Sequence, residues 1–458
     1  MKTFSTLTIS ILVAACTPSD KESSTSVRLI TVDPGHFHAA LVQKFMYDNV
    51  DSVVHVYAPN GADVELHLKR IEGFNTRADN PTHWKEEVYY GSDFFEKMIS
   101  EKAGNVVVLS GNNQKKTEYI SKSLEAGFHV LADKPMIINN TDFETLKQSF
   151  EKAKSKNLLL YDIMTERYEI STILQKEFSM LPEVFGTLQE GTPDNPSVTK
   201  ESVHHFYKYV SGSILTRPAW FMDVAQQGEG LVDVTTHLVD LVQWECFPEQ
   251  TLDYTKDIQV LSAKRTSTNM TLSEFKAITK LDNFPDYLKK DVVNDTILKA
   301  YSNAEINYKL KNVHAKVSVI WNYKAPEGAG DTHYSIMRGT KSNLIIEQGA
   351  AQQYKPTLYI QPVSNDPYFE NALSEQLKKI QNEFPGVELK KSTERWEVII
   401  PDSYKEGHEA HFGRVTEKFL EYLKNNNMPD WEVPNMLAKY YTTTKALELV
   451  RQNLKSRQ

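Results

Sequence analysis

The stretch Glu125–Pro135, EAGFHVLADKP, decides how the first part of the chain folds. Gly127 is typical of the left-handed residue that ends a helix, and the apolar run Phe128–Leu131 predicts a short buried strand directly after it. In an open parallel sheet, ligands bind outside the carboxyl ends of the strands. Lys134, which follows this strand, is therefore expected at a functional site.

Apolar runs on both sides of this stretch alternate with segments of helical pattern. The predicted strands are Val27–Val32, Ser52–Ala58, Val106–Leu109 and Leu158–Tyr161, and the predicted helices are Phe94–Ser100, Thr117–Glu125 and Phe143–Lys156. Strands that alternate with helices predict a doubly wound parallel sheet, a Rossmann domain, over residues 27–162. Residues 66–90 are polar and aromatic without a clear period, so we expect a loop-rich insertion there.

The remainder, residues 163–458, is rich in predicted strands and predicts an α+β domain with an open, mainly antiparallel sheet. The strands expected here are Ile258–Lys264, Ala304–Lys309, Val313–Tyr323, Asp331–Arg338, Ser342–Glu347, Thr357–Gln361 and Trp396–Ile400, and the helices are Glu370–Glu383, Phe412–Asn425 and Met436–Leu454. Apolar and polar residues alternate in several strands, so one face of the sheet is expected to be solvated or to form a homo-oligomer interface.

The N-terminus has the features of an export signal. Lys2 precedes an apolar run, and Val13-Ala14-Ala15-Cys16 resembles the lipobox of a bacterial lipoprotein signal. This resemblance implies a signal peptide at residues 1–15, a lipidated Cys16, a tether at residues 16–26, and a lipid-anchored protein facing the periplasm or cell surface. A plain signal peptide or a buried strand is the alternative.

Bulk composition limits the possible partners. The chain has 458 residues and a formal net charge of −8, without the clustered Lys and Arg that nucleic acid binding requires. No second apolar run is long enough to span a membrane. Cys246 is the only cysteine besides Cys16, so a disulfide within the mature chain and a thiol-based metal site are both excluded, and we predict no metal site.

The first predicted strand is followed by a turn with a single glycine, Gly35, and then by a helical pattern. Such a turn aims free backbone amides at a phosphate group. A dinucleotide fingerprint has three glycines, so the turn is equally typical of an ordinary strand-to-helix connection. After the second strand, where an acid often binds the adenosine ribose, the candidates are Asn60 and Asp63.

The run from Gly228 to Asp240 contains polar residues at helical spacing. Asp233, His237 and Asp240 lie four and three residues apart and would share one helix face. A carboxylate four residues before a histidine can accept a hydrogen bond from one ring nitrogen and leave the other for a substrate. The alternative is structural: an acid at the start of the helix and a histidine with satisfied hydrogen bonds at a domain interface.

Together these segments resemble the Gfo/Idh/MocA family, the relatives of glucose-fructose oxidoreductase and inositol dehydrogenase. The resemblance covers nearly the whole chain after the signal segment. Residues 126–135 look like the family's aGkhV…EKP motif, and residues 228–240 look like its GGG…D…H…D pattern. It implies a Rossmann domain for NAD or NADP, with NAD favoured and tightly bound, and a second domain that takes a carbohydrate substrate.

The resemblance assigns roles to single residues. It implies a catalytic set of Lys134, Asp233 and His237, with His237 as the general base. The residues expected at the cofactor are Gly35, His36, Phe37, Asn60, Ser110, Asn112, Asn113, Asp133, Lys134 and Arg167. The residues expected at the substrate are His204, His205, Arg217, Trp220 and Asp240.

The chain departs from the family pattern in four places. Asp33 and His38 replace outer glycines of the fingerprint, Asp133 replaces the Glu of the EKP motif, and Lys116 replaces a His. The missing ribose acid leaves NAD against NADP open. The change to Asp33 matters most, because a carboxylate repels a diphosphate unless it turns away.

The leading functional hypothesis is oxidation of a secondary hydroxyl of a sugar or glycoside, C3 being one candidate, with hydride transfer to nicotinamide. One rival is a glycoside hydrolase that oxidises C3 transiently, eliminates, adds water and re-reduces, so that NAD is not consumed. An export signal favours this rival, because no free nicotinamide pool recycles cofactor outside the cytoplasm. A second rival is a carbohydrate-binding lipoprotein without enzymatic activity.

Overall fold

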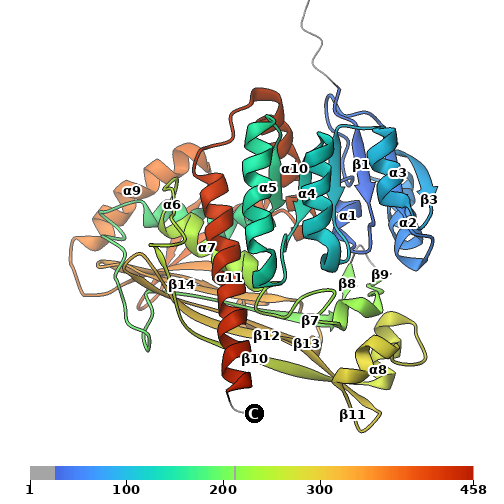
Figure 1. Ribbon diagram of the computed structural model, residues 1–458. Helices are drawn as coiled ribbons and strands as arrows, with labels where there is room; N and C mark the ends of the chain where they lie inside the picture. The colour runs from blue at the N-terminus through green and yellow to red at the C-terminus, as the bar shows by residue number, and fades with distance from the viewer. Residues whose placement is uncertain (1–25, 211–212, 457–458) are drawn as a thin grey trace, which may run out of the picture.

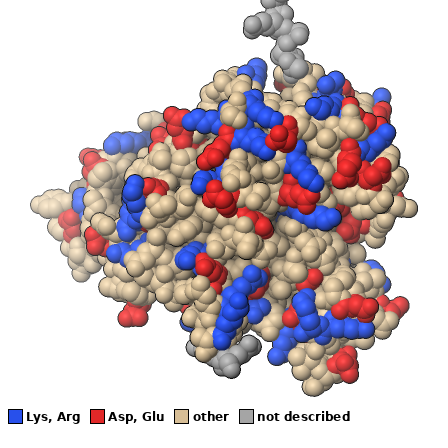
Figure 2. All heavy atoms as spheres, in the orientation of Figure 1, with Lys and Arg blue, Asp and Glu red and all other residues tan. Residues whose placement is uncertain are grey.

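The computed structural model describes residues 26–210 and 213–456 (Figure 1). The predicted signal peptide, Cys16 and all but the last residue of the predicted tether lie outside these residues. Within the described ranges, every helix is too short or too polar to cross a membrane. On the face drawn in Figure 2, basic and acidic side chains are interspersed, so the surface charge there is mixed.

A six-stranded parallel sheet forms the N-terminal part of the fold. Its strands are β1 (Leu29–Val32), β2 (Val53–Ala58), β3 (Lys85–Tyr90), β4 (Val106–Leu109), β5 (His129–Asp133) and β6 (Leu160–Ile163). They lie in the order β3-β2-β1-β4-β5-β6, and every neighbouring pair is parallel. This is the strand order of a doubly wound dinucleotide-binding sheet, so the predicted Rossmann fold is confirmed.

Helices connect these strands and cover the sheet. They are α1 (His38–Leu41), α2 (Ala62–Thr76), α3 (Phe94–Glu101), α4 (Lys116–Ala126) and α5 (Phe143–Ser155). Helix α4 ends at Gly127, whose φ of 96° is left-handed as the sequence predicts. β5 then carries Lys134 to the carboxyl edge of the sheet.

The predicted loop-rich insertion at residues 66–90 is wrong, because most of it forms α2 and β3. Strand β3 lies at the edge of the sheet, and its sequence, KEEVYY, has no fully buried residue. Helix α2 buries only Val64, His67, Ile71 and Phe74 out of 15 residues. A half-exposed edge strand and a sparse apolar stripe therefore left no strong periodic signal in the sequence.

The C-terminal part is built on a ten-stranded sheet, which confirms the predicted open, mainly antiparallel sheet. Its strands are β7 (Val198–Tyr207), β10 (Ile258–Thr271), β11 (Val292–Val293), β12 (Ile297–Leu310), β13 (Val313–Lys324), β14 (Thr332–Arg338), β15 (Ser342–Glu347), β16 (Thr357–Pro362), β17 (Glu388–Lys391) and β18 (Trp396–Ile399). The short pair β8 (Tyr209–Val210) and β9 (Ser213–Ile214) lies outside it. β7 runs parallel to β13 and antiparallel to β14.

Helices α6 (Ile170–Ser179), α7 (Thr235–Cys246), α8 (Leu272–Thr279) and α9 (Phe369–Glu383) accompany this sheet. The last two helices, α10 (His408–Asn425) and α11 (Glu432–Lys455), return to the first sheet, where Phe412 and Tyr440 join its apolar core. Figure 1 shows α11 beside α5, with its other end over β10. The end of the chain thus ties the two sheets together.

Candidate functional site

A cavity of about 1080 Å³ lies between the carboxyl ends of β1, β5 and β6 and the strands β7 and β13. Its lining is rich in titratable side chains. Eight of the chain's 13 histidines line it, namely His36, His38, His204, His205, His237, His333, His408 and His411. Lys134 also lines it, as its place after β5 predicts.

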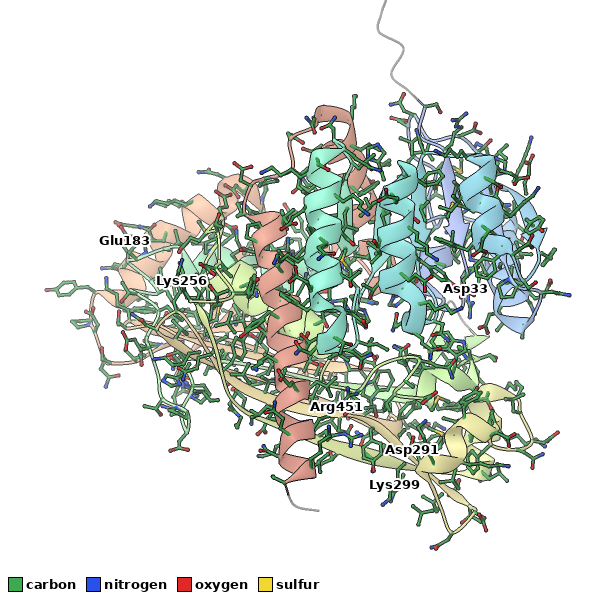
Figure 3. The ribbon with its side chains drawn as sticks, in the orientation of Figure 1. Asp33, Glu183, Lys256, Asp291, Lys299 and Arg451 are labelled. Carbon is green, nitrogen blue, oxygen red and sulfur yellow. The ribbon has the colours of Figure 1, made fainter. Side chains whose placement is uncertain are left out.

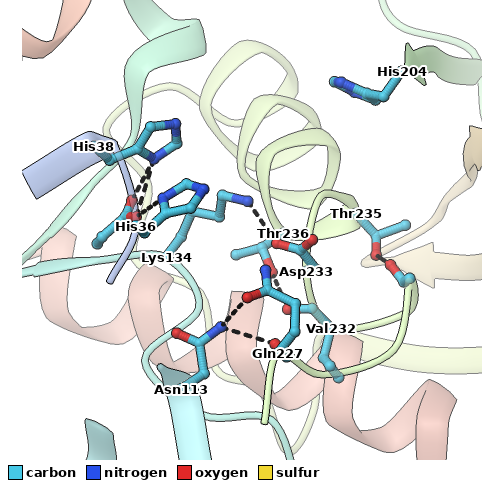
Figure 4. A network of polar contacts seen from close by, with 12 residues as sticks. His36, His38, Asn113, Lys134, His204, Gln227, Val232, Asp233, Thr235 and Thr236 are labelled. Atoms are coloured by element: carbon cyan, nitrogen blue, oxygen red, sulfur yellow. Dashed lines mark hydrogen bonds and ion pairs between the residues drawn. The ribbon is translucent and has the colours of Figure 1, made fainter. Parts of the chain in front are cut away.

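Lys134 forms a buried ion pair with Asp233. The distance from Nζ to Oδ1 is 2.6 Å, and Lys134 is only 7% exposed (Figure 4). Burial opposes ionisation of Asp233, but Lys134 outweighs it and lowers the pKa of the Asp233 carboxyl. Asp233 is therefore ionised near neutral pH, and its carboxylate holds the Lys134 side chain at the cavity wall.

The predicted hydrogen bond between Asp233 and His237 is wrong. Helix α7 begins only at Thr235, so Asp233 lies in the turn before the helix and its carboxylate is directed to Lys134. In the described part of the chain, Nδ1 of His237 has no hydrogen-bond partner. Burial and the nearby Lys134 hold the pKa of His237 well below its usual value. His237 is thus a neutral imidazole on the cavity wall beside an ammonium group.

Asp133 binds two histidines of the turn after β1. Its Oδ2 lies 3.1 Å from Nδ1 of His36 and 3.0 Å from Nδ1 of His38, the two histidines labelled in Figure 4. Ser110 Oγ donates to the same oxygen at 3.0 Å. Burial opposes ionisation of Asp133, but His38 and His36 outweigh it, so the pKa of Asp133 lies well below its usual value. Three residues expected at the cofactor, His36, Ser110 and Asp133, therefore contact one another.

The opposite wall repeats this pattern around Asp331. His204 and His205 place their Nδ1 atoms 3.2 and 3.1 Å from the two carboxylate oxygens, and Lys208 donates to Oδ2 at 2.8 Å. The ring of His204 stacks on Trp321 at 5.1 Å. His204 and His205, both on β7, thus line the cavity, where substrate contacts are expected.

Arg217 also lines the cavity, and its contacts with neighbouring residues fix its position. It donates to the backbone carbonyls of Phe206 and His205, and its guanidinium lies over the rings of Phe221 and Trp321 at 4.7 and 5.2 Å. Burial lowers the pKa of Arg217 to about 10. The structure therefore presents Arg217 as a fixed cation beside an aromatic wall.

The sequence analysis missed several carboxylates and histidines of the cavity, among them Glu166, Glu169, His408 and His411. Glu166 and Glu169 follow β6, and His408 and His411 begin α10. Burial and the neighbouring Glu166 raise the pKa of Glu169 to about 7, and burial raises that of Glu166 as well. The position of both glutamates after a parallel strand was a usable signal, whereas nothing local places α10 at the cavity.

Arg167 and Asp240 do not face the cavity. Arg167 donates to both oxygens of Asp240 at 2.7 Å and to Oε1 of Glu432 at 3.0 Å, and all three side chains are buried. Lys439 donates to Asp240 at 2.9 Å. This network joins the end of β6 to α7 and α11, so the expected cofactor and substrate residues Arg167 and Asp240 bind each other instead.

The turn at Gly35 is covered by the C-terminal part of the chain. A Cβ atom at Gly35 would lie 2.8 Å from Cζ2 of Trp220 and 3.0 Å from Oδ2 of Asp63. Trp220 Nε1 donates to the same Asp63 oxygen at 2.8 Å. The amides of Gly35 and His36 donate to Asp33 O and Ser110 O. Trp220 thus lies over the glycine turn rather than in the cavity lining.

The remaining residues expected at the cofactor lie along the same edge. Asn112 Nδ2 donates to Gln226 Oε1 and Asn113 Nδ2 donates to Gln227 O, both at 2.8 Å. Asn60 is exposed beyond β2, and Phe37 lines the cavity. Of these residues, only Phe37 faces the cavity. Asn112 and Asn113 are already bound to Gln226 and Gln227, and Asn60 is exposed.

Comparisons with known proteins agree with this architecture. Residues 35–161 match the family described as "Oxidoreductase family, NAD-binding Rossmann fold", and residues 174–451 match "Putative oxidoreductase C terminal domain". The chain belongs to the Gfo/Idh/MocA oxidoreductase family. The residues matched by the two models lie in the two sheet-based parts described above.

Individual relatives range from close to distant. The crystal structure of a "putative oxidoreductase" from Parabacteroides merdae is 57% identical, with a TM-score of 0.91 over 94% of this chain and 98% of that one. Levoglucosan dehydrogenase in complex with NADH and L-sorbose is 11% identical, with a TM-score of 0.58 over 93% of this chain and 97% of that one, which shows the fold alone. An uncharacterized oxidoreductase of Schizosaccharomyces pombe is 27% identical over 32% of this chain and only 34% of its own length.

The residues around Gly35 do not fit a diphosphate in this arrangement. Trp220 occupies the space over the glycine, and the carboxylates of Asp33 and Asp63 flank it (Figure 3 labels Asp33 at this edge of the first sheet). Burial and Asp63 raise the pKa of Asp33 to about 6, so Asp33 is mostly ionised at pH 7, and burial raises the pKa of Asp63 as well. A bound diphosphate would meet a ring and two carboxylates where the family's fold offers open backbone amides.

We expect Trp220→Ala to raise the affinity for NADH or NADPH about tenfold or more. The substitution opens the space over Gly35, and it releases the Asp63 carboxylate from the hydrogen bond that holds it beside this glycine, so that the carboxylate can turn away. Nucleotide fluorescence titration measures this change. Trp244→Ala is the matched control, since Trp244 contacts Lys176 rather than Gly35. Equal affinities in Trp220→Ala and the unmodified protein would show that Trp220 does not compete with a nucleotide.

Proposed function

We propose that the protein interconverts a secondary hydroxyl group and a ketone of a sugar or glycoside in the cavity around Lys134. The observation that carries this proposal is the placement of Lys134, Asp233 and His237 together on one cavity wall. The family is one of oxidoreductases, and the distant structural neighbour levoglucosan dehydrogenase was solved with NADH and L-sorbose. The family supports an oxidoreductase, and this neighbour supports a sugar as the substrate class.

The side chains of this wall suit the proton transfer of such a reaction. Oxidation of a hydroxyl needs a group that accepts its proton and a cation that stabilises the oxygen as negative charge develops. His237, a neutral imidazole, is the acceptor, and the ammonium of Lys134, held by Asp233, is the cation. The hydride acceptor in this proposal would be NAD or NADP. Because the turn at Gly35 does not fit a diphosphate in this arrangement, the proposal requires Trp220 to move away from Gly35 before a nucleotide binds.

The opposite wall suits a polyhydroxylated ligand. His204, Arg217 and Lys208 line it with polar groups, and the first two pack on the ring of Trp321, which is 5% exposed. Pockets for small molecules use a few fixed hydrogen-bonding groups to set the orientation of the ligand. The hydroxyls of a sugar would bind to these groups.

A second candidate, net hydrolysis of a glycoside through transient oxidation, is favoured by Glu166 and Glu169. Both carboxyls line the cavity, and both have a raised pKa. A carboxyl group that stays protonated near neutral pH can give its proton to the leaving oxygen of a glycoside. Simple oxidation of a hydroxyl does not require this acid.

We expect stability to depend on Glu169 over a defined pH range. The pKa is about 7 in the folded protein and 4.5 ordinarily, so the folded state holds this proton more tightly. Its contribution is fully present below pH 4.5 and is lost as the pH rises to about 7. Urea unfolding of Glu169→Gln should therefore show a smaller loss of stability between pH 4.5 and 7.5 than the unmodified protein. Glu375→Gln, on the exposed side of α9, should keep the original slope.

The reaction can be tested with purified protein. Denaturation followed by chromatography detects released NAD(H) or NADP(H), and a panel of glycosides with added nucleotide detects turnover. A keto-sugar formed with stoichiometric nicotinamide reduction supports the dehydrogenase, and glycoside cleavage without net reduction supports the hydrolase. A lack of released nucleotide, of nucleotide binding and of turnover would sink both and leave a carbohydrate-binding protein.

A further inference from the structure

We infer that the His36–His38–Asp133 cluster is a binding site for one divalent transition-metal ion of the zinc type, open to the cavity. The cluster contains two imidazoles and one carboxylate, whose ligand atoms all lie within 4.8 Å of one another. These are the nitrogen and oxygen donors that zinc and its neighbours prefer. The sequence analysis predicted no metal site, so this assignment comes from the structure alone.

The spacing of the donor atoms suits a small ion. A tetrahedral zinc ion with bonds of 2.0–2.1 Å has ligand atoms about 3.3 Å apart. Here Nδ1 of His38 lies 3.0 and 3.2 Å from the two oxygens of Asp133, and Nδ1 of His36 lies 3.1 Å from Oδ2. The nitrogen-to-oxygen distances are therefore close to those of a tetrahedral site, and the two histidine nitrogens lie within 4.8 Å of each other.

The cluster is formed by departures of this chain from the dinucleotide fingerprint. His38 stands where the fingerprint has its third glycine, and Asp133 stands where the related motif has Glu. The two replacements, which lie far apart in the sequence, are in direct contact. His36 lies between Gly35 and His38 on the same turn. The part of the chain that no longer fits a diphosphate thus brings together three metal-binding groups.

Surrounding groups hold the cluster in place. Ser110 donates to the Asp133 carboxylate at 3.0 Å, and Lys116 donates to its backbone carbonyl at 2.9 Å. The ring of His38 packs on Phe412 at 4.4 Å. Outer hydrogen bonds and packing of this kind orient the ligands of metal sites. They reduce the reorganisation that metal binding requires.

The charges nearby do not exclude a cation. Lys134 follows Asp133 directly in the chain, and its ammonium group is neutralised by Asp233 at 2.6 Å. Lys116 donates to the backbone carbonyl of Asp133, and burial lowers the pKa of Lys116 to about 8, while Asp133 supplies one negative charge. We therefore expect moderate rather than very tight affinity.

His36 and His38 line the cavity, so the remaining coordination positions would face a substrate. Three protein ligands with an open position are typical of catalytic rather than structural zinc sites. A metal ion here would polarise a substrate oxygen bound beside Lys134. This inference does not rest on the proposed reaction, because metal binding is measured without turnover.

The test uses full-length purified protein, stripped with a chelator and titrated with Zn²⁺ by calorimetry and with Co²⁺ by visible absorption. We expect one equivalent of metal ion to bind, and we expect the visible absorption bands of bound Co²⁺ to be those of a four- or five-coordinate ion. His38→Gln and Asp133→Asn should each weaken binding at least about 100-fold, and Ser110→Ala about tenfold. His204→Gln, which removes a histidine paired with Asp331 on the other wall, is the matched control and should bind as the unmodified protein does.

Circular dichroism and thermal melts check that each variant folds. If His38→Gln or Asp133→Asn does not fold, Ser110→Ala, which retains all three ligands, decides the question together with the Co²⁺ spectrum. Less than about a tenth of an equivalent in the unmodified protein, or binding that the cluster variants leave unchanged, would overturn the inference. Loss of binding in His204→Gln alone would place the site on the other wall and overturn it equally.

Discussion

Lys134→Met should lower kcat/KM for the sugar substrate at least about 1000-fold while the fold persists. The side chain supplies the cation at the cavity wall, and losses of this size follow when the stabilisation of a developing charge is removed. Its ammonium lies 2.6 Å from Asp233, which holds it at this wall. Initial rates over a range of substrate concentrations measure the effect.

The single variant leaves Asp233 buried without its partner, which costs about 3–5 kcal/mol of stability. Lys134→Met/Asp233→Asn removes both charges and separates lost chemistry from lost folding. We expect this double variant to melt near the unmodified protein and to remain inactive. Lys391→Met, which breaks an exposed ion pair with Glu370, should keep full activity. A folded Lys134 variant that retains a tenth of kcat/KM would contradict the proposed role.

The strands with buried apolar runs or a clear alternation of apolar and polar residues could be predicted from the sequence, whereas β3 and β7 could not. β1, β4 and β5 are buried on both faces and therefore read as continuous apolar segments. β3 lies at a sheet edge and β7 buries polar residues such as Lys200, so neither shows the expected pattern. Tertiary contacts decide such segments, and local sequence does not record them.

The same distinction holds for the site. Lys134 could be placed because a strand end in a parallel sheet has a fixed functional position. The partner of Asp233 could not, because the helical spacing to His237 was assumed to continue through a turn that precedes α7. Arg167 and Asp240, and the cover of Trp220 over Gly35, depend on residues more than 70 positions away. The spacing of residues within one segment carries no information on contacts between segments that are far apart in the sequence.

Arg167→Met should destabilise the protein by about 4 kcal/mol. This is the largest loss of stability that we expect from a single substitution outside the cavity. Arg167 donates to Asp240 at 2.7 Å and to Glu432 at 3.0 Å, and its side chain is 9% exposed. Without the guanidinium, Glu432 loses its cationic partner and Asp240 keeps only Lys439. Urea unfolding followed by circular dichroism at neutral pH measures the change.

Arg395→Met is the matched control for this variant, because Arg395 makes the same two-oxygen contact with Glu347 at 2.9 and 3.0 Å but at 29% exposure. Solvent screens such a pair, so its loss should cost about 1 kcal/mol or less. A similar cost in both variants would show that burial does not strengthen the Arg167 contacts.

The pH dependence of Arg167→Met separates electrostatics from lost packing. In the unmodified protein, burial opposes ionisation of Asp240, but Arg167 and Lys439 outweigh it and lower its pKa, so this stability is present above the usual pKa and is lost in acid. Removing Arg167 raises the pKa of Asp240 and of Glu432, and the variant can then protonate both acids at moderate cost. The deficit relative to the unmodified protein should therefore shrink as the pH falls from 7 to about 4.5. A deficit that stays constant over this range would mean that Arg167 acts mainly through the packing of its methylene groups.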